Sequence, residues 1–256
     1  MLLKEQVTLV TGGGAGIGEA IAKRFAQVGA KVVVNDIDPT SGQNVVDEIS
    51  KRGGEVSFIQ GDTSREADAE RMVRYTVEKF GALDILINNA GIEIVKALHE
   101  MTVEEWDSIN NINLKGVFLV ARAAARQMLM QDKGVMVNIS SVAGLIGIPM
   151  LGAYGVTKHG VIGLTKVMAL ELRPQNIRVN ALCPGFIGDT KMFDRVLVLS
   201  EAQGIPVHDA CIRLQGCLGT PDQVAGAALF LASDESSFIS GVALPIDIGV
   251  TAGCGF

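Results

Sequence analysis

A tyrosine and a lysine stand four positions apart in the segment "YGVTK" at residues 154–158. On a helix, this spacing places Tyr154 and Lys158 on one face, one turn apart. A free phenol has a pKa of about 10 and is a weak base at neutral pH, and a neighbouring ammonium group favours the phenolate. The pair therefore raises the hypothesis that the Lys158 ammonium tunes the acidity of the Tyr154 phenol. A chance pairing on a helix surface is the alternative, and the surrounding residues decide between the two.

Two loops rich in asparagine, serine and glycine precede this pair. The segments "INNAG" at 87–91 and "NISSVAG" at 138–144 each close an apolar run that is typical of a buried strand. Open α/β sheets bind ligands at the carboxyl ends of their strands. Asparagine amides can also tie loop backbones together. We expect both loops at the same edge of a sheet as Tyr154.

The segment "TGGGAGIG" at 11–18 holds five glycines between an apolar run and a helical pattern. It does not match Gly-x-Gly-x-x-Gly in any register, and instead reads Thr-Gly-x-x-x-Gly-x-Gly with Gly12, Gly16 and Gly18. Glycines permit a tight turn and a close backbone approach, and the following helix N-terminus offers unpaired N–H groups to a diphosphate. We interpret this segment as the phosphate-binding turn of a dinucleotide site rather than as a flexible connection.

Asp36 ends the second apolar run, eighteen residues after Gly18. A carboxylate at this place can accept hydrogen bonds from both ribose hydroxyls of an adenosine and repels a 2′-phosphate. No Arg or Lys stands at position 37 or within the glycine loop. The sequence therefore predicts NAD rather than NADP. Asp62, in "QGDTS", can contact the adenine or cap the next helix, and both interpretations stay open.

Short apolar runs and helical patterns alternate along the chain and must position these residues. The expected strands are 7–10, 31–36, 56–59, 83–88, 134–140, 177–182 and 241–247. Their near-continuous apolar character indicates strands covered on both faces. Helices are expected at 18–29, at 64–81 with Ser64 as its cap, and at 102–129 with a Thr102–Glu105 capping box. This alternation predicts an α/β fold: one Rossmann-like domain over 1–256, a doubly wound, seven-stranded parallel sheet flanked by helices.

The segment at about 188–217 interrupts the alternation before a helix that begins near Thr220 and Pro221. A long insertion in a compact domain is typically functional, and we expect a lid over the site.

Composition excludes several classes of function. Hydrophobic residues make up 48% of the chain and charged residues 20%, which suits a large buried core. The net charge of −6 and the scattered basic residues give no reason to bind nucleic acid or an anionic membrane. No targeting or membrane-spanning segment is expected, and neither is a metal site, so we predict a cytoplasmic protein with reduced cysteines.

Taken together, these motifs resemble the short-chain dehydrogenase/reductase family over essentially the whole chain. The matching positions are Thr11-Gly12-x-x-x-Gly16-x-Gly18, Asn88-Asn89-Ala90-Gly91, Asn113, Ser141, Tyr154-x-x-x-Lys158 and Pro184-Gly185. The resemblance implies that Tyr154 is the general acid and base, and that Lys158 holds the nicotinamide ribose. It also implies that Ser141 binds the substrate oxygen and that Asn113 anchors a proton-relaying water. We prefer Ser141 to Ser140 because Ser141 lies thirteen residues before Tyr154, the family's usual interval.

The same resemblance implies a wider set of residues at the NAD site. These are Gly12, Gly14, Gly16, Ile17, Gly18, Asp36, Asp62, Thr63, Asn89, Ala90, Gly91, Tyr154, Lys158, Pro184, Gly185, Ile187 and Thr190. Thr190 departs from the pattern, because the family's nicotinamide-contacting threonine falls one place earlier, where this chain has Asp189. Either the loop bulges by one residue or Thr190 does not make the contact. Ile248 also replaces a glycine that is usual near the C-terminus.

The expected activity is NAD(H)-dependent interconversion of a secondary alcohol and a ketone, with a hydrophobic or cyclic substrate. Candidate substrate residues are Glu93, Leu145, Met150, Met192 and Phe193, although the apolar ones could simply pack the lid and Glu93 could be an exposed loop carboxylate. A 3-oxoacyl-thioester reductase and a non-catalytic dinucleotide sensor are the rivals. The resemblance further suggests a homotetramer.

Overall fold

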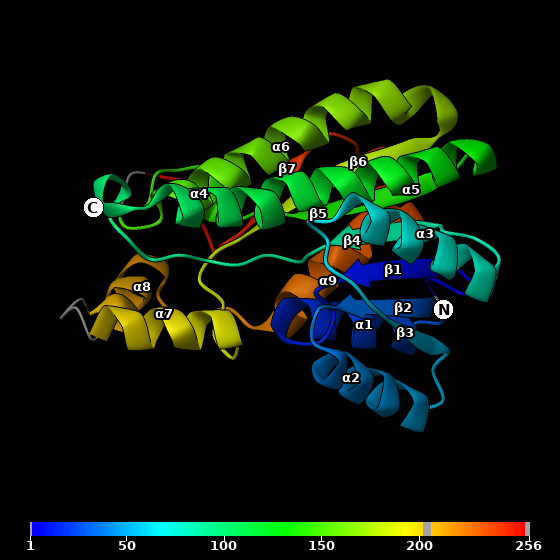
Figure 1. Cartoon of the computed structure of the whole chain (residues 1–256), viewed down its shortest axis with the longest axis horizontal. Coiled ribbons are helices and arrows are strands. Elements are labelled where there is room, and N and C mark those ends of the chain that lie inside the picture. The colour runs from blue at the N-terminus through cyan, green and yellow to red at the C-terminus, as the bar shows by residue number, and fades with distance from the viewer. Residues whose placement is uncertain (1, 202–205, 254–256) are drawn as a thin grey trace.

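The computed structural model describes residues 2–201 and 206–253, and its centre is a seven-stranded, fully parallel sheet of order β3-β2-β1-β4-β5-β6-β7 (Figure 1). The strands are β1 Val7–Thr11, β2 Lys31–Asp36, β3 Val56–Gln60, β4 Ile85–Asn88, β5 Gly134–Ile139, β6 Ile177–Pro184 and β7 Ala243–Ile246. All seven expected strands are present, and the predicted fold class is confirmed. The strand order reverses between β1 and β4, so a crevice opens at their carboxyl ends.

Successive residues of each strand pack into two different cores. Val10, Val32 and Ile85 belong to the core on one face of the sheet, whereas their neighbours Leu9 and Leu86 belong to the core on the other face. This alternation follows from the two-residue period of a strand. Because both faces are covered, the strands read as continuous apolar runs in the sequence.

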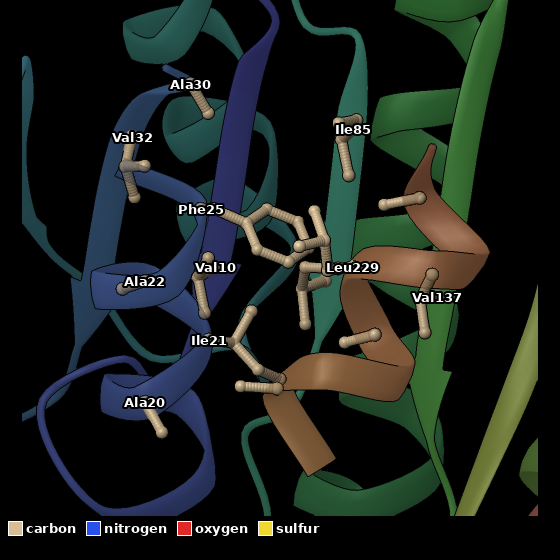
Figure 2. Packing of buried hydrophobic residues seen from close by; sticks show 14 of the residues in the cluster. Val10, Ala20, Ile21, Ala22, Phe25, Ala30, Val32, Ile85, Val137 and Leu229 are labelled. Atoms are coloured by element: carbon tan, nitrogen blue, oxygen red, sulfur yellow. The ribbon is translucent and has the colours of Figure 1, made fainter. Parts of the chain in front are cut away.

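The first face is covered by α1 Gly16–Gln27, α2 Pro39–Lys51 and α9 Pro221–Ala232. Figure 2 shows Phe25 of α1 and Leu229 of α9 meeting over Val10 of β1. A capping box of Thr220 and Gln223 begins α9, near the position expected from the sequence. Asp38 caps α2, a helix for which we made no prediction.

The second face is covered by α3 Glu66–Phe80, α5 Val117–Gln131 and α6 Gly152–Leu172, and α4 Val103–Asn110 packs against α6. The Thr102–Glu105 capping box is present at the start of α4. The single helix expected at 102–129 is wrong, since residues Asn111–Gly116 form a π-helical segment between α4 and α5. The Ser64 cap is also wrong. Arg65 stands at the N-cap of α3, and Ser64 instead donates its N–H and hydroxyl to Asp62.

The insertion after β6 contains two helices, α7 Lys191–Glu201 and α8 Val207–Gln215, which lie together at one side of the molecule (Figure 1). Residues 202–205 of this expected lid lie outside the described residues. Among the described helices, none is both long and apolar enough to cross a membrane. Cys183, Cys211 and Cys217 carry free thiols, and Cys254 lies outside the described residues.

Candidate active site

Hydrogen bonds tie the ends of β1 and β4 together at the sheet's reversal point. The Thr11 hydroxyl accepts hydrogen bonds from the backbone N–H groups of Asn89 and Ala90, at 3.0 and 3.2 Å. The Asn89 amide donates to the carbonyls of Thr11 and Gly12, at 3.0 and 2.9 Å. The asparagine of "INNAG" therefore fastens the glycine loop to the neighbouring strand end, as its residue type predicts.

The glycine loop is too close to its neighbours to accept larger residues. Gly12 has a φ of 61°, and a Cβ built on it would lie 2.8 Å from the Cα of Ala90. A Cβ built on Gly18 would lie 2.2 Å from the Gly12 carbonyl oxygen, far inside van der Waals contact. The tight turn and the close packing of α1 on the loop both require glycine. The loop leads directly into α1, whose first residues, Gly16 and Ile17, line the crevice.

Asp36 is held in place at the end of β2. One carboxylate oxygen accepts the backbone N–H of Gly14 at 2.9 Å, and the other accepts the backbone N–H of Asp38 at 3.0 Å. Asp62 accepts hydrogen bonds from Ser64 as described above, but it does not cap α3, whose N-cap is Arg65, and it lines the crevice.

A cavity of ≈ 460 Å³ runs along this sheet edge from Asp36 to Ile92. It is lined by Gly12, Ala15, Gly16, Ile17, Asn35, Asp36, Ile37, Asp38, Ser41, Gly61, Asp62, Thr63, Asn89, Ala90, Gly91, Ile92, Ile112, Thr190, Lys191, Met192 and Arg195. A dinucleotide requires a glycine-rich turn whose backbone its diphosphate can approach. It also requires a carboxylate that accepts hydrogen bonds from its ribose hydroxyls. The residues present therefore fit such a cofactor. Gly14 donates its backbone N–H to Asp36, and Gly18 packs closely against Gly12 and Asn89. The remaining predicted residues Pro184, Gly185 and Ile187 line the adjoining cavity.

A second cavity, of ≈ 310 Å³, adjoins the first and contains the phenol of Tyr154. Both cavities are lined in part by the same residues: Ile17, Asn89, Gly91, Thr190 and Met192. The second cavity is mainly apolar, with Ile148, Pro149 and Val196 among its lining residues. Glu93, Met150, Met192 and Phe193 line it as well. Leu145 is placed elsewhere, against the buried cluster of Ile162, Ala181 and Cys183, which contradicts its expected place at the substrate.

The hydroxyl groups of Ser140 and Ser141 have different surroundings. Ser140 is buried and donates its hydroxyl to the backbone carbonyl of Lys158 at 2.9 Å. Ser141 follows β5 and its side chain hydrogen-bonds with the Tyr154 phenol, and both serines line the second cavity. The structure therefore leaves Ser141, the serine preferred from the sequence, next to the phenol.

Tyr154 and Lys158 lie one turn apart on α6, and burial governs the pKa of each. Lys158 is almost completely buried, and its Nζ donates to the carbonyl of Ile139 at 2.8 Å. Burial lowers the pKa of Lys158 to about 8. Burial raises the pKa of Tyr154 to about 12; the hydrogen bond with Ser141 opposes this rise, and the charge of Glu93 adds to it. In the protein alone the phenol pKa is therefore raised, the opposite of the direction expected from Lys158.

The side chain of Asn113, within the π-helical segment, is fully buried. Its Oδ1 accepts the backbone N–H of Ile92 at 2.8 Å, and its Nδ2 donates to the Ile92 carbonyl at 2.8 Å. Asn113 thus fixes the loop that follows "INNAG" against α6, where Thr157 gives it a longer contact of 3.4 Å.

Glu93 forms an ion pair that the sequence did not reveal. Its side chain is only 5% exposed, and Arg195 of α7 donates to both carboxylate oxygens, at 3.1 and 3.4 Å. Burial raises the pKa of Glu93, while the Arg195 guanidinium opposes that rise. The exposed-loop alternative for Glu93 is therefore wrong. We also made no prediction for Lys191 and Arg195, and their four-residue spacing on a helical pattern is the signal that could have identified them.

Asp189 and Thr190 lie where the sequence departs from the family pattern by one residue, just before α7. Asp189 adopts a φ of 52° in the left-handed region, and Thr190 then faces the glycine loop. A Cβ built on Gly16 would lie 3.4 Å from the Thr190 methyl group. Thr190 lines both cavities, and its contact with the nicotinamide stays a prediction.

Comparison with curated proteins finds relatives across nearly the whole chain. A family model described as enoyl-(acyl carrier protein) reductase matches residues 12–251. The chain is 42% identical to an uncharacterized oxidoreductase of Thermotoga maritima, covering 98% of this chain and 100% of the relative. It is 36% identical to 2-(S)-hydroxypropyl-CoM dehydrogenase 3 of Xanthobacter autotrophicus, with 98% of each covered. It is 41% identical to the 3-oxoacyl-[acyl-carrier-protein] reductase FabG of Thermotoga maritima, with 98% and 99% covered.

Solved structures superpose on the same extent of chain. A short-chain type dehydrogenase/reductase from Mycobacterium marinum has a TM-score of 0.90 at 35% identity, with 98% of this chain and 97% of that chain covered. Levodione reductase has a TM-score of 0.93 at 33% identity, with 98% and 100% covered. NAD+-bound xylitol dehydrogenase has a TM-score of 0.92 at 33% identity, with 96% and 99% covered. The chain is therefore an oxidoreductase that belongs to the short-chain dehydrogenase/reductase family.

Proposed function

We propose that this protein is an NAD(H)-dependent dehydrogenase/reductase that interconverts a secondary alcohol and a ketone in the Tyr154 cavity. The observation that carries the proposal is the position of the Ser141–Tyr154 pair. It faces a mainly apolar cavity that shares its wall with a cavity suited to a dinucleotide. A substrate carbon in the second cavity would then lie next to the nicotinamide end of the first.

The protein's own groups would handle the proton. When bound, the cofactor supplies or accepts the hydride. In reduction, Tyr154 donates its phenolic proton to the substrate oxygen while Ser141 hydrogen-bonds that oxygen, so the C=O group becomes CH–OH. With a pKa of about 12, the Tyr154 phenol is protonated at neutral pH, so the proton that reduction requires is present. In oxidation, the proton moves from the alcohol to Tyr154, and positive charge near the ring assists by favouring the phenolate.

Lys158 and Asn113 would act from behind the reacting groups. The Lys158 ammonium lies close to Gly91, since a Cβ built on Gly91 would be 3.7 Å from Nζ. From there it can bind the nicotinamide ribose without approaching the substrate. Because the Asn113 side chain is committed to Ile92, we assign it the task of fixing this wall of the cofactor cavity. The proton-relaying water implied by the family resemblance would have to be held by another group, such as one of the main chain.

Asp36 supports NAD as the cofactor rather than NADP. Its carboxylate is fixed by Gly14 and Asp38, and it lines the cavity at the end of β2, where a 2′-phosphate would meet negative charge. NAD+ in the similar xylitol dehydrogenase agrees with this assignment.

The lining of the second cavity supports a hydrophobic or cyclic substrate. Apolar side chains from the loop 148–151 and from α7 surround the space, and Glu93 is the carboxylate among its lining residues. Glu93 would disfavour an anionic group next to Tyr154. It could accept a hydrogen bond from a second hydroxyl of the substrate.

A 3-oxoacyl-thioester reductase is the second candidate, because relatives of that name are 38–41% identical over almost the whole chain. Asp36 counts against it to the extent that such reductases use NADPH. We also propose a homo-oligomer, with four copies by family resemblance. Exposed large apolar side chains on α5 and α6 support an oligomer, because such residues are available to pack against a second copy. They are Phe118, Met130, Val167 and Leu170. Light scattering on the purified protein tests the assembly.

The experiment for the activity is a substrate panel followed by nicotinamide absorbance. Cyclic and acyclic secondary alcohols with NAD+, the matching ketones with NADH, and an acetoacetyl thioester with NADH and NADPH form its arms. Turnover of an alcohol–ketone pair supports the proposal. A strong preference for the thioester with NADPH would replace it with the second candidate, and dinucleotide binding without any turnover would indicate a sensor.

A further inference from the structure

Helix α7 supplies both basic side chains that line the dinucleotide cavity within the described part of the chain. Lys191 and Arg195 stand four residues apart and therefore project from one face of α7. The glycine loop contributes no basic residue to the same cavity. The other charged residues along its wall are the carboxylates of Asp36, Asp38 and Asp62.

The two basic residues attach α7 to opposite sides of the cavity. Lys191 Nζ lies 3.5 Å from the hydroxyl of Ser41 on α2, beside the Asp36 end. Arg195 is paired with Glu93, beside the Tyr154 end. Thr190, immediately before α7, lies against Gly16 between these two points. The helix thus crosses the cavity at the level of the phosphate-binding turn.

The two basic residues differ in what they can still bind. Arg195 already has a carboxylate partner that is almost fully buried. Lys191 is exposed and forms no ion pair among the residues whose side chains the structure describes, although its charge helps to lower the pKa of Asp38. Its contact with Ser41, at 3.5 Å, is at the limit of a hydrogen bond. An ammonium group on a flexible stem can leave such a contact for an anion in the same cavity.

We propose that Lys191 binds the diphosphate of the dinucleotide from the lid side, opposite the glycine loop. A diphosphate carries two negative charges, and three carboxylates line the cavity that receives it. Backbone N–H groups of the glycine loop offset part of this repulsion. Lys191 offers the missing full positive charge, and the Arg195–Glu93 pair holds α7 in the position from which Lys191 reaches the cavity.

Cofactor binding then favours the closed lid. The dinucleotide gains the Lys191 contact only when α7 lies across the cavity, so the closed arrangement binds it more tightly. The same helix contributes Met192, Phe193 and Val196 to the substrate cavity, so the bound cofactor also completes the substrate site. This inference rests on the proposed dinucleotide binding but is separate from the identity of the substrate.

The test measures dissociation constants of NADH, NADPH and ADP-ribose by calorimetry for the wild type and for Lys191→Gln. We expect Lys191→Gln to weaken all three by about tenfold, since each contains the diphosphate and a charge-assisted contact contributes about this much. Displacement of NADH by adenosine should give the same adenosine affinity in both proteins. Lys191→Arg should recover most of the lost affinity. Increasing salt should weaken NADH binding more steeply in the wild type than in Lys191→Gln.

Arg213→Gln is the matched control, because it removes one positive charge from an exposed residue of α8 that does not line the cavity. It should bind NADH like the wild type. NADH affinities within twofold for the wild type and Lys191→Gln overturn the inference. A loss confined to NADPH also overturns it, because that result would place Lys191 at a 2′-phosphate. If the wild type binds none of the three ligands, the proposed function fails together with the inference.

Discussion

The ammonium nitrogen of Lys158 lies 5.5 Å from the centroid of the Tyr154 ring, and its hydrogen bond goes to the carbonyl of Ile139. Both ionisable groups are buried, and burial favours the neutral form of each. It lowers the pKa of Lys158 to about 8 and raises the pKa of Tyr154 to about 12. A buried ammonium without a carboxylate partner costs stability. The buried ammonium therefore lowers the stability of the free protein. The site suits a ligand that brings hydroxyl groups and charge of its own.

Lys158→Met should therefore stabilise the free protein while abolishing turnover. The folded-state pKa of about 8 is depressed from 10.5, a difference equivalent to about 3 kcal/mol against folding at neutral pH. Methionine fills similar space without charge, and loss of the bond to Ile139 offsets about 1 kcal/mol. We expect a net gain of about 1–2 kcal/mol in the free energy of unfolding, measured with urea at pH 7.

The pH dependence checks the cause of this gain. Between pH 8 and 10.5 the unfolded chain keeps the Lys158 proton while the folded protein loses it, so wild-type stability rises with pH across this window. The advantage of Lys158→Met should be largest below pH 8 and shrink toward pH 10.5. An advantage that is constant across this range, or absent at pH 7, would contradict burial as the cause.

Gly18→Ala should destabilise the protein by about 2 kcal/mol and weaken NADH binding. The added methyl carbon would lie 2.2 Å from the Gly12 carbonyl oxygen and 2.5 Å from the Asn89 amide nitrogen, so the loop must move. Gly226→Ala, in α9, is the control because no atom lies within 4 Å of the added carbon. It should stabilise by about 0.5–1 kcal/mol. Equal thermal unfolding of the two variants would refute the packing argument.

Ile248→Gly should stabilise the protein by about 1 kcal/mol. Ile248 has a φ of 50° and is 75% exposed, so it carries left-handed strain in a β-branched residue with little burial in return. Glycine removes the strain at some cost in chain entropy. Ile248→Ala keeps the Cβ atom and should gain less. Thermal unfolding of the three proteins measures the order, and a lower melting temperature for the glycine variant would rule out the strain.

Asp36→Asn should reduce the preference for NADH over NADPH. We expect the wild type to bind NADH at least about tenfold more tightly than NADPH. The 2′-phosphate of NADPH removes the charge-assisted contact between Asp36 and the ribose hydroxyls, and it is repelled by the Asp36 carboxylate. Asparagine can still accept the Gly14 N–H with its single amide oxygen, while the hydrogen bond from the Asp38 N–H is lost. Competition titrations against both cofactors give the ratio. Equal affinities in the wild type would disprove the role assigned to Asp36.

Local patterns predicted the fold and one side of the site well. The β-branched runs fix all seven strands, and the Thr102–Glu105 capping box fixes the start of α4. Helix α2 could have been predicted too, from Asp38 followed by Pro39, which is a common helix start. The edge at which Thr11, Asn89 and Tyr154 meet follows from strands that all run in one direction.

Features that depend on distant contacts escaped prediction. The π-helical segment contains Asn113, whose side chain is bonded to Ile92, twenty-one residues earlier, and no local period encodes that contact. The Glu93–Arg195 pair joins residues 102 positions apart. The raised pKa of Tyr154 depends on burial in the folded cavity, whereas its spacing from Lys158 suggested the opposite shift.

The most direct test of the account compares the wild type with Tyr154→Phe, using the best alcohol–ketone pair of the panel. Phenylalanine removes only the phenolic oxygen, so dinucleotide binding should be retained within a few-fold by NADH calorimetry. We expect kcat to fall by about a thousandfold or more, because both the proton transfer and the hydrogen bond with Ser141 are lost. Turnover within tenfold of the wild type, with NADH still bound, would contradict the role of Tyr154 as general acid and base.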